Sequence, residues 1–362
     1  MERVYNFSPG PAVLPLSVLE EAQRDLLALP GTGISILEIS HRSKSFQSII
    51  DTAEANLRKL MNIPDNFRVM FLQGGASLQF GMLPMNLLNG KSADYIVTGT
   101  WSKKAMGEAK KIGSINCVWN GSETNFNHLP TTEELQAKLD PDAAYVYYTS
   151  NETIQGVQFP TEPEVGRPLV CDASSEFLYK PIDWSKYGCV YACAQKNCGP
   201  AGVTIVVMRD DFVAASPDNL VNILSYKTMS ENGSMLNTPP CFAIYIFKLV
   251  TDWMLNTVGG VDKMYECNQQ KAALLYDVID RSNGFYLGHA EKNCRSLMNV
   301  PFKMATSDLD KQFLADAAAE GLVSLGGHRS VGGFRASIYN AMPLEGVQKL
   351  AAFMEDFMKK NG

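Results

Sequence analysis

The sequence lacks the features that mark several large classes of protein. Basic residues number 32 against 38 acidic ones in 362 residues, and no basic run is long enough to follow a nucleic-acid backbone. No apolar run approaches the length of a bilayer span, and the first residues lack the charged and apolar regions of a signal peptide. We therefore expect a cytoplasmic protein that binds neither nucleic acid nor membrane.

Signatures of metal sites and disulfides are missing as well. The eight cysteines form no C-x-x-C pair, even where they are closely spaced, at Cys189, Cys193 and Cys198. With only four histidines, a zinc site would have to draw on distant segments. No G-x-G-x-x-G follows a predicted strand, which argues against a dehydrogenase. These absences predict reduced, buried cysteines and no metal site.

What the chain does contain is an alternation of short apolar strands and helices from about residue 67 to 208. Several strands are apolar throughout, as expected where both faces of a sheet are covered. Repeated strand–helix–strand units predict a mostly parallel sheet with helices on both faces. The predicted strands are 69–72, 95–98, 115–119, 144–149, 169–171, 190–193 and 203–208. The predicted helices between them are 78–88, 102–112 and 132–139.

A second region begins near Pro239-Pro240, which is a helix-start signal. It predicts an α+β domain of about 100 residues, small enough to pack beside the first region. Its predicted helices are 242–255, 261–282, 307–320 and 344–359, and its predicted strands are 298–304 and 334–338. The expected organisation is an N-terminal segment packing near the small domain, a large α/β domain and a small C-terminal domain, at 1–30, 31–255 and 256–362.

One lysine lies just past a predicted strand and before a Gly-Pro turn. Lys196 sits among small residues, where a ligand can approach the backbone closely, and a neutral, unobstructed amine can form a Schiff base. Asp172 ends an earlier strand, where it could keep a pyridinium nitrogen protonated, as pyridoxal 5′-phosphate (PLP) requires. On spacing alone, a solvated lysine after a strand is the better interpretation. The lysine, the acid and the turn together indicate a PLP enzyme.

Other residues near predicted strand ends could hold the same cofactor. Gly74 and Gly75 stand between a strand and a helix, where backbone N–H groups bind anions, and Ser77 and Gln195 could add to a phosphate site.

Two further residues could contact the cofactor ring. Trp101 closes a predicted strand and could stack on a pyridine ring, although a core tryptophan fits its position equally well. Thr153 follows the predicted strand 144–149 and could bind the phenolic oxygen of the ring.

Two His-Arg doublets point to the substrate. His41-Arg42 precedes a polar stretch, and His328-Arg329 lies in a glycine-rich loop shortly before Arg335. Guanidinium groups bind carboxylates and phosphates in a bidentate manner. Either doublet alone is more often a surface pair, but both together favour a substrate with two anionic groups.

The longest motifs make the chain resemble the phosphoserine aminotransferase family, a branch of the class-V PLP-dependent aminotransferases, nearly end to end. The motifs that carry the resemblance are 6–12, 40–42, 74–80, 151–154, 194–197, 232–240 and 327–343. The resemblance implies the PLP-dependent transferase fold type I (aspartate-aminotransferase-like), with a seven-stranded, mostly parallel sheet. It also implies a homodimer that transfers an amino group between glutamate and 3-phosphohydroxypyruvate in serine biosynthesis, giving O-phosphoserine and 2-oxoglutarate.

The resemblance further implies residue roles. Lys196 would carry the cofactor and move the proton, and Asp172 would bind the pyridine nitrogen. The remaining cofactor contacts would be Trp101 on the ring, Thr153 at its phenolic oxygen, Ala76, Ser77 and Gln195 at the phosphate, and Asn237 and Thr238 from the other subunit. The substrate contacts would be Arg335 at the carboxylate, and His41, Arg42, His328 and Arg329 at the phosphate or distal carboxylate.

One departure and several alternatives stay open. Many relatives carry an arginine where this chain has Ser77, so phosphate binding here would depend more on Arg42 and Arg329. A cysteine desulfurase would need an exposed late cysteine, for which Cys294 is a weak candidate, and an alanine–glyoxylate aminotransferase would not need both doublets. A non-catalytic dimeric binding protein of the same fold is the alternative from another class.

Overall fold

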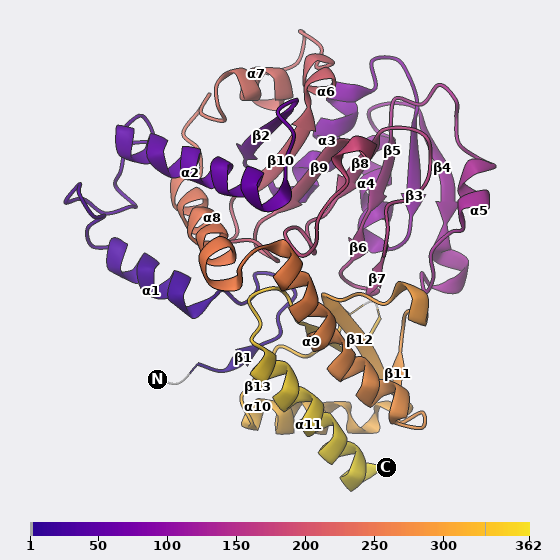
Figure 1. The fold of residues 1–362 in the computed structure, drawn as a ribbon. Coiled ribbons are helices and arrows are strands. Elements are labelled where there is room, and N and C mark those ends of the chain that lie inside the picture. The colour runs from indigo at the N-terminus through magenta and orange to yellow at the C-terminus, as the bar shows by residue number, and fades with distance from the viewer. Residues whose placement is uncertain (1–2, 330) are drawn as a thin grey trace.

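A seven-stranded sheet forms the centre of the larger part of the molecule in the computed structural model, which describes residues 3–329 and 331–362 (Figure 1). The strands in spatial order are β2 (Phe67–Leu72), β10 (Thr204–Arg209), β9 (Tyr187–Cys193), β8 (Leu169–Asp172), β5 (Val146–Thr149), β3 (Ala93–Val97) and β4 (Ile115–Asn120). Only β10 is antiparallel to its neighbours, β2 and β9. The seven predicted strands and the mostly parallel sheet are therefore confirmed.

Helices cover both faces of this sheet, and β2 shows how. Val69 and Phe71 pack with α2 (Lys44–Met61) and α8 (Cys241–Trp253), whereas Met70 and Leu72 pack with α3 and α4 on the other face. Because successive side chains of a strand point to opposite faces, an apolar strand needs cover on both. The other helices of this part are α3 (Gly75–Leu87), α4 (Thr100–Ala109), α5 (Thr132–Gln136), α6 (Asp210–Ala214) and α7 (Tyr226–Glu231).

A second hydrophobic cluster forms the core of the smaller part, drawn in orange and yellow in Figure 1. Its sheet has the order β11–β12–β14 and is antiparallel. The elements are α9 (Val261–Arg281), β11 (Tyr286–Gly288), β12 (Asn299–Met304), α10 (Asp310–Ala319), β14 (Phe334–Ser337) and α11 (Leu344–Asn361). This matches the predicted α+β pattern with two exceptions. The helix predicted at 242–255 packs on the large sheet as α8, and β11 is too short to give a pattern of its own.

The N-terminal segment contacts both parts. β1 (Tyr5–Asn6) pairs with β13 (Leu322–Val323), and Phe7 is fully buried in the smaller core. Farther along, α1 (Leu16–Asp25) packs on α8, where the Tyr245 hydroxyl donates to Asp25 at 2.6 Å. The segment therefore ties the two parts together, while the domain boundaries given above remain a prediction.

One stretch of the large part corrects the expectation that no apolar run approaches the length of a bilayer span. Cys241–Val258, which is α8 plus the π-helical turn η4 (Met254–Val258), is long and apolar enough to cross a membrane, with mean hydropathy 1.2. Lys248 and Asp252 lie within this stretch and form an ion pair at 2.7 Å. Because these two charged residues interrupt the apolar run, its full length is not evident from the sequence. Half of this stretch is buried inside the protein, and α8 packs against α2, as expected of a core helix.

Candidate active site

The lysine predicted to react lies in the connection between the neighbouring strands β9 and β10, as expected. The Lys196 ammonium donates to the Thr153 hydroxyl at 2.7 Å. The N-terminal segment passes directly against the lysine stem, since a Cβ on Gly10 would lie 3.1 Å from Lys196 Cγ, and Gly10 has a φ of +143°. Ala12 N–H then donates to the Gln195 carbonyl at 2.9 Å. The lysine is thus held between the large part and the N-terminal segment.

The predicted acidic partner is buried near the same point. Asp172 is the last residue of β8, and its Oδ1 accepts from Ser174 N–H at 2.9 Å. Burial raises the pKa of Asp172, while the positive charge of Lys196 opposes the rise. A cation or a ring N–H placed beside this carboxyl would therefore favour its ionised form.

Trp101 does not close a strand, which corrects the prediction. β3 ends at Val97, and Trp101 lies in the first turn of α4. Gly99, just before the helix, still has extended backbone, so the chain turns into the helix only after the sheet has ended. The indole nevertheless reaches the site, because the Lys196 ammonium lies 5.0 Å from the centroid of its ring.

The glycine loop precedes α3 as predicted. Gly74 and Gly75 have φ values of +89° and +65°, which other residues rarely adopt, and the first helical residues include Ala76 and Ser77. This gives the loop free N–H groups at the start of a 13-residue helix.

Asn237 and Thr238 lie beside this loop within one chain. The Gln73 amide donates to the Thr238 carbonyl at 2.9 Å. Asn237 and Gly74 border a common cavity of about 320 Å³.

Positive charge gathers on the side of the smaller part. Arg335, in β14, is buried and donates to the Thr153 carbonyl at 3.3 Å, and burial lowers its pKa. Burial also lowers the pKa of His328, and the charges of Arg335, Arg329 and Lys104 act in the same direction. Arg335 therefore lies beside Thr153, and its charge and that of Lys104 act on His328 of the second doublet. The Lys104 ammonium lies 4.6 Å from the centroid of the Trp101 ring.

No described hydrogen bond or ion pair joins the first doublet to this cluster. His41 and Arg42 lie just before α2, in the loop that extends along the left edge of Figure 1. His41 Nε2 is buried without a hydrogen-bond partner among the described residues. Within residues 3–329 and 331–362, no hydrogen bond or ion pair links the Arg42 side chain to Lys196 or Arg335. That both doublets converge on one substrate stays a prediction.

The assembled groups fit a phosphorylated aromatic cofactor with a reactive carbonyl. An amine, a buried carboxyl, an aromatic ring and a glycine loop at a helix start lie around one point. Two buried donors, Trp101 Nε1 and Arg335 Nε, have no partner among the described residues, and a bound anionic molecule would satisfy such groups.

Comparison with known proteins decides the family. The aminotransferase class-V family matches residues 4–350. The chain belongs to the class-V aminotransferases. It is 53% identical to the phosphoserine aminotransferase of Rhodopirellula baltica over 364 residues, which cover 99% of this chain and 96% of that protein.

Solved structures agree over the same length. A phosphoserine aminotransferase from Bacillus circulans subsp. alkalophilus is similar with a TM-score of 0.97 and 46% identity, covering 100% of both chains. A PLP-bound phosphoserine aminotransferase from Trichomonas vaginalis gives 0.92 and 40%, covering 98% of this chain and 100% of that one. The predicted family and the predicted fold type I are confirmed.

Three residues of this aminotransferase site escaped the sequence reasoning. Glu152, in β6 (Asn151–Glu152), accepts hydrogen bonds from the start of α4. Asn340 donates its backbone N–H to Asn197 Oδ1 at 2.8 Å and so ties the smaller part to the lysine loop. Lys104 gave no signal because it looks like any exposed helix lysine. Only Glu152 offered a clue, as an acid three residues after the end of the buried strand β5.

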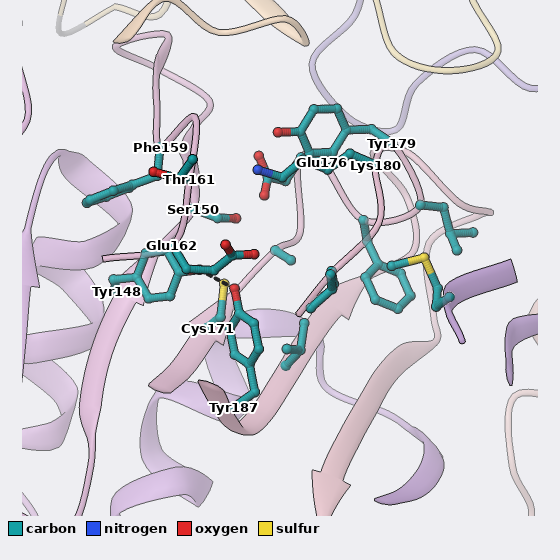
Figure 2. A pocket seen from close by; sticks show the side chains of 16 residues that line it. Tyr148, Ser150, Phe159, Thr161, Glu162, Cys171, Glu176, Tyr179, Lys180 and Tyr187 are labelled. Atoms are coloured by element: carbon teal, nitrogen blue, oxygen red, sulfur yellow. Dashed lines mark hydrogen bonds between the residues drawn. The ribbon is translucent and has the colours of Figure 1, made fainter. Parts of the chain in front are cut away.

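A separate small cavity lies behind β8 in this aminotransferase and is not part of the site (Figure 2). Its volume of about 20 Å³ suits one water molecule. Cys171 and Glu176 line it, and Glu176 accepts from the Gln158 amide at 2.5 Å. Lys196, Trp101 and Arg335 are not among its lining residues.

Proposed function

We propose that this chain is a cytoplasmic phosphoserine aminotransferase. It uses PLP to transfer an amino group reversibly between glutamate and 3-phosphohydroxypyruvate, giving O-phospho-L-serine and 2-oxoglutarate in serine biosynthesis. The observation that carries the proposal is the meeting at Thr153, which binds Lys196 through its hydroxyl and Arg335 through its carbonyl. A reactive amine and a carboxylate-binding guanidinium are thereby placed beside a single residue. Relatives that share the whole chain are named phosphoserine aminotransferases.

The residues that would hold the cofactor divide by its parts. Asp172 would accept a hydrogen bond from the protonated ring nitrogen and so keep that nitrogen charged, and Trp101 would cover one face of the ring. Thr153 would bind the phenolic oxygen. Ala76, Ser77 and Gln195 would bind the phosphate, with Asn237 and Thr238 of the partner subunit. Because the phosphate would face backbone N–H groups at the start of α3, its negative charge matches the helix dipole.

The chemistry then divides between cofactor and protein. When bound, PLP supplies an electron sink that stabilises negative charge on the substrate carbon next to the nitrogen. The Lys196 amine, once neutral, takes the proton from that carbon and later returns one. Thr153 keeps this amine in place through the 2.7 Å hydrogen bond. Arg335 orients the substrate through its carboxylate, and Arg329 and His328 bind the second anionic group.

The test uses the purified protein with PLP, followed by O-phosphoserine in the absence of any keto acid. We expect the visible absorbance band of the lysine-bound cofactor to disappear as the amino group moves to the cofactor. Bleaching by alanine but not by O-phosphoserine would reject the substrate. Absence of any band after addition of PLP would reject the enzyme and favour a binding protein of this fold.

We also propose a homodimer with shared active sites. The loop between α1 and α2 carries exposed apolar side chains, with Leu27 87% and Leu37 63% exposed, and ends at His41-Arg42. Exposed apolar groups of this kind commonly mark an interface. A second copy that covers this loop would bring the first doublet to the other subunit's site, and would explain why it does not reach Lys196 in its own chain.

A further inference from the structure

A buried carboxylate next to Thr153 takes no part in the mechanism above. Glu152 has no exposed surface, and three donors from the start of α4 surround it. Its Oε2 accepts from Trp101 N–H at 2.9 Å, and its Oε1 accepts from Ser102 N–H at 2.8 Å and from the Ser102 hydroxyl at 2.6 Å. Since the first N–H groups of a helix lack partners within the helix, one carboxylate here satisfies two of them.

The surroundings are shaped to hold this carboxylate. A Cβ on Gly99 would lie 2.4 Å from Glu152 Cδ, so only glycine allows the carboxylate to approach the helix end so closely. Burial raises the pKa of Glu152, while the hydrogen bonds from Ser102 and Trp101 oppose the rise. The positive end of the α4 dipole also favours the ionised form.

The same short segment holds three groups of the site. Glu152 binds the backbone of Trp101, and the adjacent Thr153 binds both Lys196 and Arg335. Gln155 adds a reciprocal pair with Thr100, at 3.3 Å to its N–H and 2.8 Å to its hydroxyl. The indole is thus fixed relative to the lysine through one stretch of backbone.

We propose that Glu152 is a positioning residue that sets the indole of Trp101 over the cofactor-binding site. Its carboxylate fixes the first turn of α4, and the position of that turn decides where the ring lies relative to Lys196. The inference rests on the proposed use of PLP. It predicts that Glu152 contributes to cofactor affinity only through Trp101.

The Glu152→Gln variant tests this with the shape of the side chain preserved. Whichever way the amide turns, its NH2 group faces one of the two backbone N–H donors, so one buried hydrogen bond is replaced by a repulsive contact. We expect the dissociation constant for PLP, titrated by its visible absorbance on the apoprotein, to rise about tenfold. Gly99→Ala, which pushes a methyl group against the carboxylate, is expected to act in the same way.

A double-mutant cycle separates positioning from general stabilisation. In a Trp101→Ala background, Glu152→Gln is expected to leave the dissociation constant unchanged, because the ring through which it acts is gone. The proposal would be overturned if Glu152→Gln raised the dissociation constant for PLP equally in both backgrounds. It would also be overturned if Glu152→Gln alone kept the wild-type dissociation constant.

The matched control is Glu176→Gln, a buried carboxylate that lines the separate cavity of Figure 2 and makes no described contact with Trp101. It is expected to keep the wild-type constant in both backgrounds. Failure of the wild-type protein to bind PLP would instead reject the proposed function itself.

Discussion

At the scale of single residues, position in the fold decides which of several lysines can act chemically. Lys196 and Lys104 both have their ammonium groups within 5.0 Å of the centroid of the Trp101 ring. Only Lys196 lies beside Asp172, since its charge acts on that buried carboxyl. We therefore assign the proton transfer to Lys196 and an electrostatic role to Lys104.

Replacement of Lys196 gives the most direct prediction at this scale. Lys196→Ala removes the amine that binds the cofactor covalently and moves the proton, so turnover is expected to fall by several orders of magnitude, on the order seen when a covalent nucleophile is removed. The absorbance spectrum should lack the band of lysine-bound PLP, although PLP itself should still bind. Lys103→Ala, on the exposed side of α4, serves as control and should behave like the wild type. A Lys196→Ala variant with near-normal turnover would rule out the assigned role.

The positive cluster around His328 gives a second residue-scale prediction. Besides burial, the charges of Arg335, Arg329 and Lys104 lower the pKa of His328, because each opposes a further positive charge. Lys104→Gln removes one of these charges, and the pKa of His328 should therefore rise toward its ordinary value. Titration of the four histidines by NMR measures this shift, with Lys103→Gln as control. An unchanged or lower pKa of His328 in Lys104→Gln would contradict the arrangement.

At the scale of elements, one buried amine fixes the segment that follows β14. Lys271, within α9, has no exposed surface and donates to the carbonyls of Ile338, Tyr339 and Met342 at 3.0, 2.8 and 3.1 Å. This segment also contains Asn340, which binds Asn197 beside the reactive lysine. The helix thereby holds the end of β14, and with it Arg335, against the lysine loop.

Lys271 makes stability depend on pH in a defined direction. Burial lowers the pKa of Lys271 from 10.5 to about 8. Between these two values the unfolded chain binds more protons than the folded one, so the free energy of unfolding rises with pH. Below about pH 8 both states are protonated and this dependence ends. The unfolding free energy of the wild type minus that of Lys271→Met should therefore increase by about 2 kcal/mol from pH 8 to 10.

Urea denaturation across this pH range measures the difference. The control is Lys263→Met, on the exposed face of the same helix, where Lys263 pairs with Glu266 in solvent. The unfolding free energy of the wild type minus that of Lys263→Met should not change with pH below about pH 10. A flat profile for Lys271→Met as well would show that its amine titrates normally in the folded protein.

At the scale of the whole molecule, features that depend on buried apolar strands could be predicted from the sequence. Features that depend on contacts between residues far apart in the chain could not. The strands of the large sheet and the lysine between β9 and β10 followed from local patterns. The pairing of β1 with β13 joins residues more than 300 positions apart, and two-residue strands leave no periodicity to detect. The sequence predicts Trp101 at the end of a strand because nothing in its neighbours reveals that Glu152 caps the start of α4 at Thr100.

In the proposed dimer, the first His-Arg doublet shows that contacts between two chains are equally hard to predict from the sequence. Its residues were predicted to meet the substrate, yet they precede α2 at the edge of the molecule, far along the chain from the cluster at Arg335. In a two-fold symmetric dimer, a segment at the interface lies near the same segment's counterpart and can reach the partner's site. Each active site would then use Lys196 from one subunit and His41-Arg42 from the other.

Subunit mixing tests this division. Lys196→Ala and Arg42→Gln should each have little activity as homodimers. After the two are unfolded and refolded together, the mixed dimer contains one site with both substitutions and one with neither. Because random pairing makes about half of the dimers mixed, activity should recover to about a quarter of the wild-type value. If both residues served the site of their own chain, every site would carry one defect and mixing would recover nothing.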